Sequence, residues 1–174
     1  MLFLTFSESL HLSMLSKALS SLNTLRIRLF SKVTVSYLRL LGADVCWTTL
    51  FYGPVSIIGD PANLSIGSHT KINHNVLINC TDLVSIGSYV TISSGVTLHT
   101  STYQTFRVHV SAPIRIQSHV WIASSAVILP GVSIGTHSIV GALSLVTSST
   151  PPNTVSFGSP ARTIREIDSS WFNL

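Results

Sequence analysis

A strict six-residue repeat runs through the C-terminal half of the chain and constrains its fold more than any other feature. Branched aliphatic residues occupy every sixth position, at Ile116, Ile122, Ile128, Ile134, Val140 and Val146. An α-helix repeats about every 3.6 residues and a β-strand about every 2, so neither element alone produces this period. A hexapeptide repeat is instead typical of a β-helix, in which short strands stack rung upon rung.

Each hexad carries a second inward position, four residues after the aliphatic. These positions are small or β-branched: Val120, Ala126, Val132, Ser138 and Ser144. Weaker hexads begin at Val55 and form two series separated by a two-residue insertion, Ile66, Ile72, Ile78 and then Ile86, Ile92, Leu98. With three hexads, about 18 residues, per turn, residues 55–150 supply about five turns of an all-β solenoid. Gly67, Gly87 and Gly135 directly follow an aliphatic, where we expect corners of positive φ.

The repeat is interrupted once and then ends. Residues 99–113 form a polar segment too long for a corner, and loops that leave a rigid scaffold commonly carry function. After Val146 the hexads stop near Thr150, and the remaining tail contains Arg162 and Arg165. We therefore expect a β-helix over 42–150 with a break loop at 99–113, followed by a C-terminal tail over 151–174.

Residues 1–41 show helical rather than hexad spacing. Leu12, Leu15, Leu19 and Leu22 recur at intervals of three and four, and Gly42 is a plausible stop signal. We expect this helical segment to cap the open end of the solenoid, since a bare terminal rung offers unpaired backbone groups to other chains.

The N-terminal segment is also basic. It holds five of the ten basic residues and only one acid, Glu8; the five are Lys17, Arg26, Arg28, Lys32 and Arg39. One interpretation is an amphipathic helix that packs on the β-helix with its charges in solvent. The alternative is peripheral contact with an anionic membrane surface. Nucleic-acid binding is disfavoured, because aromatic residues do not alternate with the cations over a broad face.

Composition and cysteine usage predict a cytoplasmic protein. Although 45% of the residues are hydrophobic, the longest apolar run falls far short of the roughly 20 residues that span a bilayer. No small-residue cleavage site follows the first residues. Cys46 and Cys80 are far apart in the sequence and form no Cys-x-x-Cys pair, so we expect both to be reduced.

Two segments resemble the hexapeptide-repeat acyltransferases, in particular the maltose, galactoside and colanic-acid O-acetyltransferases. The first is Val-Trp-Ile-Ala at 120–123 with Leu-Pro-Gly-Val-Ser-Ile-Gly at 129–135. The second is Pro-Pro-Asn at 151–153 with Gly-Ser-Pro-Ala-Arg at 158–162. The resemblance implies a left-handed parallel β-helix, a homotrimer with active sites between neighbours, and transfer of acetyl from acetyl-CoA to a hydroxyl of a sugar or polysaccharide precursor, with no metal.

The resemblance also implies roles for individual residues. Ser124, Ala142 and Thr147 would line the groove for the pantetheine arm, and Arg162 and Arg165 would approach the nucleotide phosphates. Guanidinium groups pair well with phosphate oxygens, and the alternative for these arginines is a solvated tail. Asn79 and Trp121 would line the acceptor pocket, although the tryptophan has packing as its alternative role.

In this family a histidine of the break loop is the general base, and here that position holds Tyr103. A tyrosine has a pKa of about 10 in model peptides. It is therefore protonated at neutral pH and is a poor base. Three alternatives follow. His99 or His109 of the same loop takes over as base, the chain binds CoA or a partner without turnover, or it is a decayed copy that still folds.

A zinc protein of the carbonic-anhydrase type is a further alternative, because some β-helices bind zinc through histidines. His69 and His74 are five residues apart on adjacent hexads, but zinc needs at least three ligands and no third is evident. The tail motif favours the transferase. His119 and His137 occupy outward hexad positions, for which we infer no role.

Overall fold

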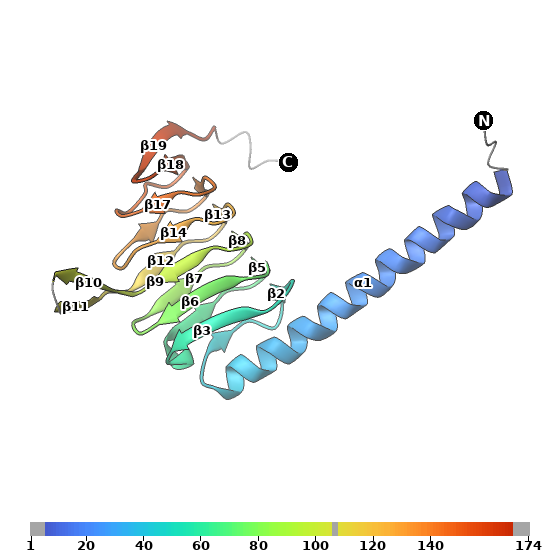
Figure 1. Cartoon of the computed structure of the whole chain (residues 1–174), viewed down its shortest axis with the longest axis horizontal. Helices are drawn as coiled ribbons and strands as arrows, with labels where there is room; N and C mark the ends of the chain where they lie inside the picture. Colours follow the sequence, from blue (N-terminus) through green and yellow to red (C-terminus); the bar gives the residue numbers. More distant parts are fainter. Residues whose placement is uncertain (1–5, 106–107, 169–174) are drawn as a thin grey trace.

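The computed structural model, which describes residues 6–105 and 108–168, confirms the predicted β-solenoid. One long helix, α1 (Phe6–Leu40), precedes a parallel β-helix whose rungs stack from β1 to β18 (Figure 1). The chain visits three faces in turn, which we name A, B and C. The three kinds of corner between them are named A–B, B–C and C–A.

Faces A and C hold five strands each, and face B holds seven. Face A consists of β1 (Asp44–Val45), β4 (Leu64–Ile66), β7 (Val84–Ile86), β12 (Ile114–Ile116) and β15 (Ser133–Ile134). Face B consists of β2 (Leu50–Phe51), β5 (Lys71–Ile72), β8 (Thr91–Ile92), β13 (Trp121–Ile122), β16 (Ile139–Val140), β18 (Thr154–Gly158) and β19 (Ala161–Glu166). Face C consists of β3 (Val55–Gly59), β6 (Val76–Cys80), β9 (Thr97–His99), β14 (Val127–Ile128) and β17 (Leu145–Val146). A short 3-10 helix, η1 (Pro61–Asn63), precedes β4.

The aliphatic position of each hexad points into the prism and stacks on its counterpart in the next turn. On face B, Ile72, Ile92, Ile122 and Val140 are successive register partners, and all four are fully buried. The second inward positions, Val120, Ala126, Val132, Ser138 and Ser144, are buried as well. The hexad pattern therefore builds one continuous core, and the removal of this apolar surface from water stabilises it.

The expectation of positive φ at the hexad glycines is wrong. Among the described residues, positive φ occurs two positions later at the A–B corners, at His69, Tyr89 and His137. Gly67, Gly87 and Gly135 instead meet the backbone of the next turn, where an added Cβ at Gly67 would lie 2.7 Å from Gly87 C. These glycines allow close rung stacking, and the strained conformation falls on the aromatic residues.

The aromatic rings at the A–B corners form a stacked column of His69, Tyr89, His119 and His137. Successive ring centroids are 5.0, 5.0 and 4.6 Å apart. Partial burial, together with the charge of neighbouring His119, lowers the pKa of His137. Protonation of His137 is therefore disfavoured within the column.

Stability should fall as the pH drops through the range in which histidine ionises. An unfolded histidine has a pKa of about 6.5, so the unfolded chain binds a proton at a higher pH than folded His137 does. The contribution is complete above about pH 6.5 and is lost as the pH falls toward the lower folded value. We expect a lower urea midpoint at about pH 5.5 than at about pH 7.5. His137→Asn, which tolerates the left-handed backbone, should reduce this difference, and an unchanged pH dependence would contradict the assignment.

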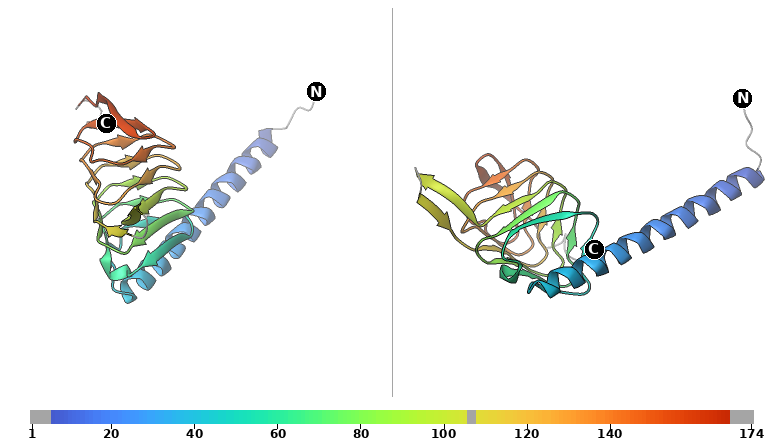
Figure 2. Two further views of the ribbon diagram at one scale, coloured as in Figure 1. Left: turned by 60° about the vertical axis from the view of Figure 1, so that its left-hand side comes forward. Right: turned by 60° about the horizontal axis from the view of Figure 1, so that its bottom comes forward.

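Helix α1 docks on the first turn of the β-helix through its C-terminal end only. Ser31, Val35 and Leu38 are buried there, whereas the helix upstream extends away from the prism (Figure 2). The backbone N–H of buried Phe51 donates to Ser31 Oγ at 2.9 Å. The predicted cap is therefore partial. Within the described residues, no helix combines the length and apolar character needed to cross a membrane.

Replacing Ser31 with alanine should lower the free energy of unfolding by about 1–3 kcal/mol, because it leaves the buried N–H of Phe51 without its acceptor. Thr34→Ala is the matched control, since the Thr34 hydroxyl makes an exposed hydrogen bond to Phe30 O within the same helix. Urea denaturation of both variants measures the difference. Equal stabilities would show that the Ser31 bond does not anchor α1.

The break loop and the tail are both built from strands. The break loop leaves a C–A corner as a hairpin of β10 (Ser101–Thr105) and β11 (Val108–Ser111), and residues 106–107 lie outside the described part. In the tail, β18 continues face B beside β16, and β19 folds back antiparallel on β18. The tail therefore extends the β-helix and is not a loose appendage.

Candidate functional site

The predicted site residues fall into two groups at different corners of the prism. Asn79, His99 and Tyr103 lie at the C–A corner where the hairpin leaves, and we name them the hairpin group. The groove group lies along face B and the B–C corner; its members are Trp121, Ser124, Ala142, Arg162 and Arg165. Thr147 follows β17 and lies at a C–A corner, apart from Ser124 and Ala142.

In the hairpin group, Asn79 and His99 are parallel register partners on the outer side of face C. The inward positions beside them are taken by fully buried Ile78 and Leu98. The Asn79 amide Nδ2 donates to Ser101 Oγ at 3.0 Å, at the start of β10. Asn79 thereby ties the hairpin to the scaffold next to the imidazole of His99.

Tyr103 shares a side of β10 with Ser101, because the two are two residues apart on one strand. Its antiparallel partner on β11 is His109, and the two rings meet edge to face with centroids 5.6 Å apart. The Tyr103 side chain is 74% exposed. The hairpin thus presents a phenol and an imidazole together on the side that leads to Asn79.

The groove group begins with two stacked corners. The backbone N–H of Leu143 donates to Ser124 O at 3.0 Å, so exposed Ser124 and Ala142 lie one above the other. The ring of Phe157 in β18 lies so close to Gly141 that an added Cβ would collide with it. The surface of this corner therefore leads directly to the hairpin of β18 and β19.

Arg162 and Arg165 lie on the same side of that hairpin, although residues three apart on a regular strand point to opposite sides. Arg165 pairs with Val155 and Arg162 with Phe157, and these two partners share one side of β18. A register shift in the pairing places both arginines on this side. Two exposed guanidinium groups on one side of a hairpin are suited to phosphate oxygens.

Trp121 is 48% exposed on face B, and its indole N–H donates to Ser93 Oγ at 3.1 Å. The next residue, Ser94, is hydrogen-bonded through Oγ to His74 Nε2. The tryptophan is therefore held toward the B–C corner by a polar contact. The sequence does not indicate that Ser93 is the partner of Trp121 or that Ser101 is the partner of Asn79, because each of these hydrogen bonds joins residues far apart in the chain.

The structure separates the two histidines of the zinc alternative. His69 stacks on Tyr89 at an A–B corner, whereas His74 contacts Ser94 at the other end of β5. Within residues 6–105 and 108–168, no three potential ligands gather to hold a metal ion.

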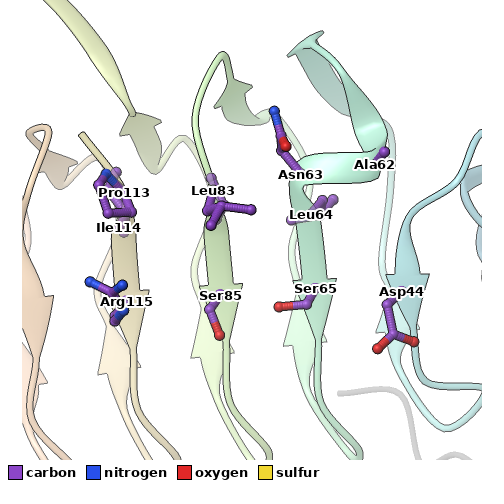
Figure 3. Close-up of a pocket in the computed structure, with 11 residues that line it drawn as sticks. Asp44, Ala62, Asn63, Leu64, Ser65, Leu83, Ser85, Pro113, Ile114 and Arg115 are labelled. Atoms are coloured by element: carbon purple, nitrogen blue, oxygen red, sulfur yellow. The ribbon is translucent and has the colours of Figure 1, made fainter. Parts of the chain in front are cut away.

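Two features lie outside the predicted site, a groove on face A and the two cysteines. A shallow groove of about 180 Å³ on face A, lined by Ser65, Ser85 and Arg115 among others, contains none of the predicted site residues (Figure 3). Cys46 and Cys80 are both free, as expected. Burial raises the pKa of the Cys80 thiol to about 11, so Cys80 is a packing residue.

Comparison with known proteins identifies the class. Residues 113–148 match the family model for the bacterial transferase hexapeptide (six repeats). Nodulation protein L of Rhizobium meliloti is 38% identical over 122 residues, which is 63% of this chain and 67% of that protein. The chain belongs to the hexapeptide-repeat acyltransferases.

Within this family, the galactoside O-acetyltransferase of Escherichia coli is 42% identical over 113 residues, covering 62% of this chain and 56% of that enzyme. This chain thus spans about half the length of several curated relatives that it matches. A hexapeptide-repeat acetyltransferase from Vibrio cholerae, solved in complex with acetyl coenzyme A, has a TM-score of 0.69 and 29% identity, covering 88% of this chain and 89% of that one.

Proposed function

We propose that this chain is an acetyl-CoA-dependent O-acetyltransferase acting on a hydroxyl of a sugar or polysaccharide precursor in the cytoplasm. One observation carries the proposal: Arg162 and Arg165 share one side of the terminal hairpin, beside the corner formed by Ser124 and Ala142. This arrangement offers cations for the nucleotide phosphates of CoA and exposed backbone for its pantetheine arm. The acetyl-CoA complex of the Vibrio cholerae relative supports the choice of cosubstrate.

The same proposal includes a homotrimer with shared sites. The hairpin group and the groove group lie at different corners, so one copy of the chain does not bring them to one place. Closed symmetric assemblies repeat the same contact around the axis, and a three-fold axis would join the hairpin group of one copy to the groove group of its neighbour. Each trimer would then contain three equivalent sites.

In the reaction, His99 takes the proton of the acceptor hydroxyl while the oxygen attacks the thioester carbonyl. The carbon–sulfur bond then breaks, and the CoA thiolate takes the proton from the imidazolium. His99 is favoured because it adjoins Asn79, the predicted acceptor residue. His109 is the second candidate, because its ring contacts Tyr103, which occupies the family's base position.

Free thiol release by the purified full-length chain with acetyl-CoA tests the function across a panel of sugars and nucleotide sugars. We expect release above background with at least one acceptor. A second candidate function, a trimer that binds CoA without turnover, is favoured by Tyr103 alone. Calorimetry separates the two: CoA binding without any thiol release would support the second, and no CoA binding would contradict both.

A further inference from the structure

Helix α1 carries two apolar faces, and the β-helix covers only one of them. The covered face contains Ser31 and Leu38, which are buried against the first turn. Leu22 and Leu29 precede these residues by nine positions each, which is about two and a half turns and therefore the opposite side of the helix. We define the free stripe as the exposed residues on this opposite side, namely Leu19, Leu22, Leu25, Leu29 and Val33.

The free stripe is too exposed to be an incidental surface feature. Its side chains are 54–69% exposed, in consecutive turns of one helix. Single exposed aliphatics are ordinary on protein surfaces, whereas a contiguous apolar patch marks an interaction site. The free stripe lies opposite the covered face, and the helix that carries it extends away from the β-helix (Figure 2).

Cations accompany the free stripe without any acid. Lys17, Arg26, Arg28 and Lys32 are exposed, and no Asp or Glu occurs between Lys17 and Arg39. Arg39 differs from the other four, because it contacts Asp44 at 3.8 Å and lies over the Trp47 ring. Arg28, Lys32 and Trp47 line a groove of about 530 Å³ between α1 and the first turn, and Leu25 and Leu29 of the free stripe line it as well.

This charge pattern distinguishes between two apolar partners. If the free stripe paired with its own copy, Arg26, which falls within the heptad series of Leu19, Leu22, Leu29 and Val33, would meet a second arginine in the seam. Lys32, on the flank of that seam, would find no acid to pair with, and like charges at such positions are destabilising. An anionic surface complements both the apolar residues and the cations.

We propose that α1 holds the protein on an anionic membrane surface, with the free stripe in the interface and Arg26, Arg28 and Lys32 against lipid phosphates. The β-helix then stands on the aqueous side of the helix. This inference does not depend on the proposed acetyl transfer, since the surface lies on α1 and neither site group contains any of its residues.

Co-sedimentation of the full-length chain with vesicles tests the proposal. We expect binding to phosphatidylcholine vesicles that contain about 30% phosphatidylserine to be at least about ten-fold tighter than to pure phosphatidylcholine. Leu22→Asp/Leu29→Asp, and separately Arg26→Glu/Arg28→Glu/Lys32→Glu, should each abolish this binding. Matched controls are Leu83→Asp and Arg115→Glu, which alter an exposed leucine and an exposed cation on the β-helix.

Several outcomes would overturn the proposal. Equal binding to neutral and anionic vesicles would show that the cations have no role in binding. No binding to either kind of vesicle would show that α1 does not bind membranes. A smaller assembly for Leu22→Asp/Leu29→Asp in light scattering, without vesicle binding by the parent chain, would show that the free stripe joins copies of this chain. Far-UV circular dichroism of every variant confirms that α1 is retained.

Discussion

Replacing His99 with alanine should lower kcat/KM for acetyl transfer by about 10²- to 10⁴-fold, the usual loss when a positioned base is removed. The expectation rests on the place of His99 beside Asn79, on the outer side of face C where the hairpin begins. Thiol release at saturating acetyl-CoA measures the loss.

His109→Ala is the matched control, because it removes an imidazole from the same hairpin. We expect it to change the rate only a few-fold. The reverse result, a large loss for His109→Ala and a small one for His99→Ala, would move the base to the ring that contacts Tyr103. If both variants kept full activity, no histidine of the break loop would be the base.

Two inactive variants should restore each other's activity when they share a trimer. One is His99→Ala, in the hairpin group, and the other is Arg162→Glu/Arg165→Glu, in the groove group. If each site joins the hairpin group of one copy to the groove group of the next, random mixing leaves about a quarter of the sites with both groups intact. Activity should therefore recover to about a quarter of the parent value after joint refolding or co-expression.

The control for this experiment pairs two variants of the same group. His99→Ala mixed with Asn79→Ala should recover nothing, because every site still lacks one member of the hairpin group. A mixture of the two different groups that stayed inactive would contradict the shared site. Size-exclusion chromatography with light scattering confirms that the mixed chains form trimers.

The sequence alone predicts the scaffold because each rung depends on a local pattern of residues that repeats along the chain. An aliphatic every sixth residue is sufficient to place Ile122 inside the prism, and the stacking of Ile72, Ile92 and Val140 on it follows from the repeat. The corner conformations are less predictable. The sequence predicts a positive φ at Gly67, but the residue in the left-handed region is His69. A glycine is required at position 67 because a side chain there would collide with the backbone of the next turn.

The candidate site is predictable only in part, since its contacts depend on register between distant segments. Tyr103 opposite His109 follows from how the hairpin pairs, and residues 99–113 do not reveal that pairing. The common side of Arg162 and Arg165 follows from one register shift against β18, which no residue spacing signals. The division of the site into two corners emerges only from the order of the faces.

The hairpin leaves the prism without disturbing it, so the sequence of the hairpin can change without a change in the register of the scaffold. β7 and β12 pair residue for residue, Val84 with Ile114 and Ile86 with Ile116, although the whole hairpin lies between them in the chain. The hairpin therefore leaves the register of face A intact. A foreign loop grafted between His99 and Ile114 would therefore change the hairpin side of the proposed site and keep the register that places the groove group.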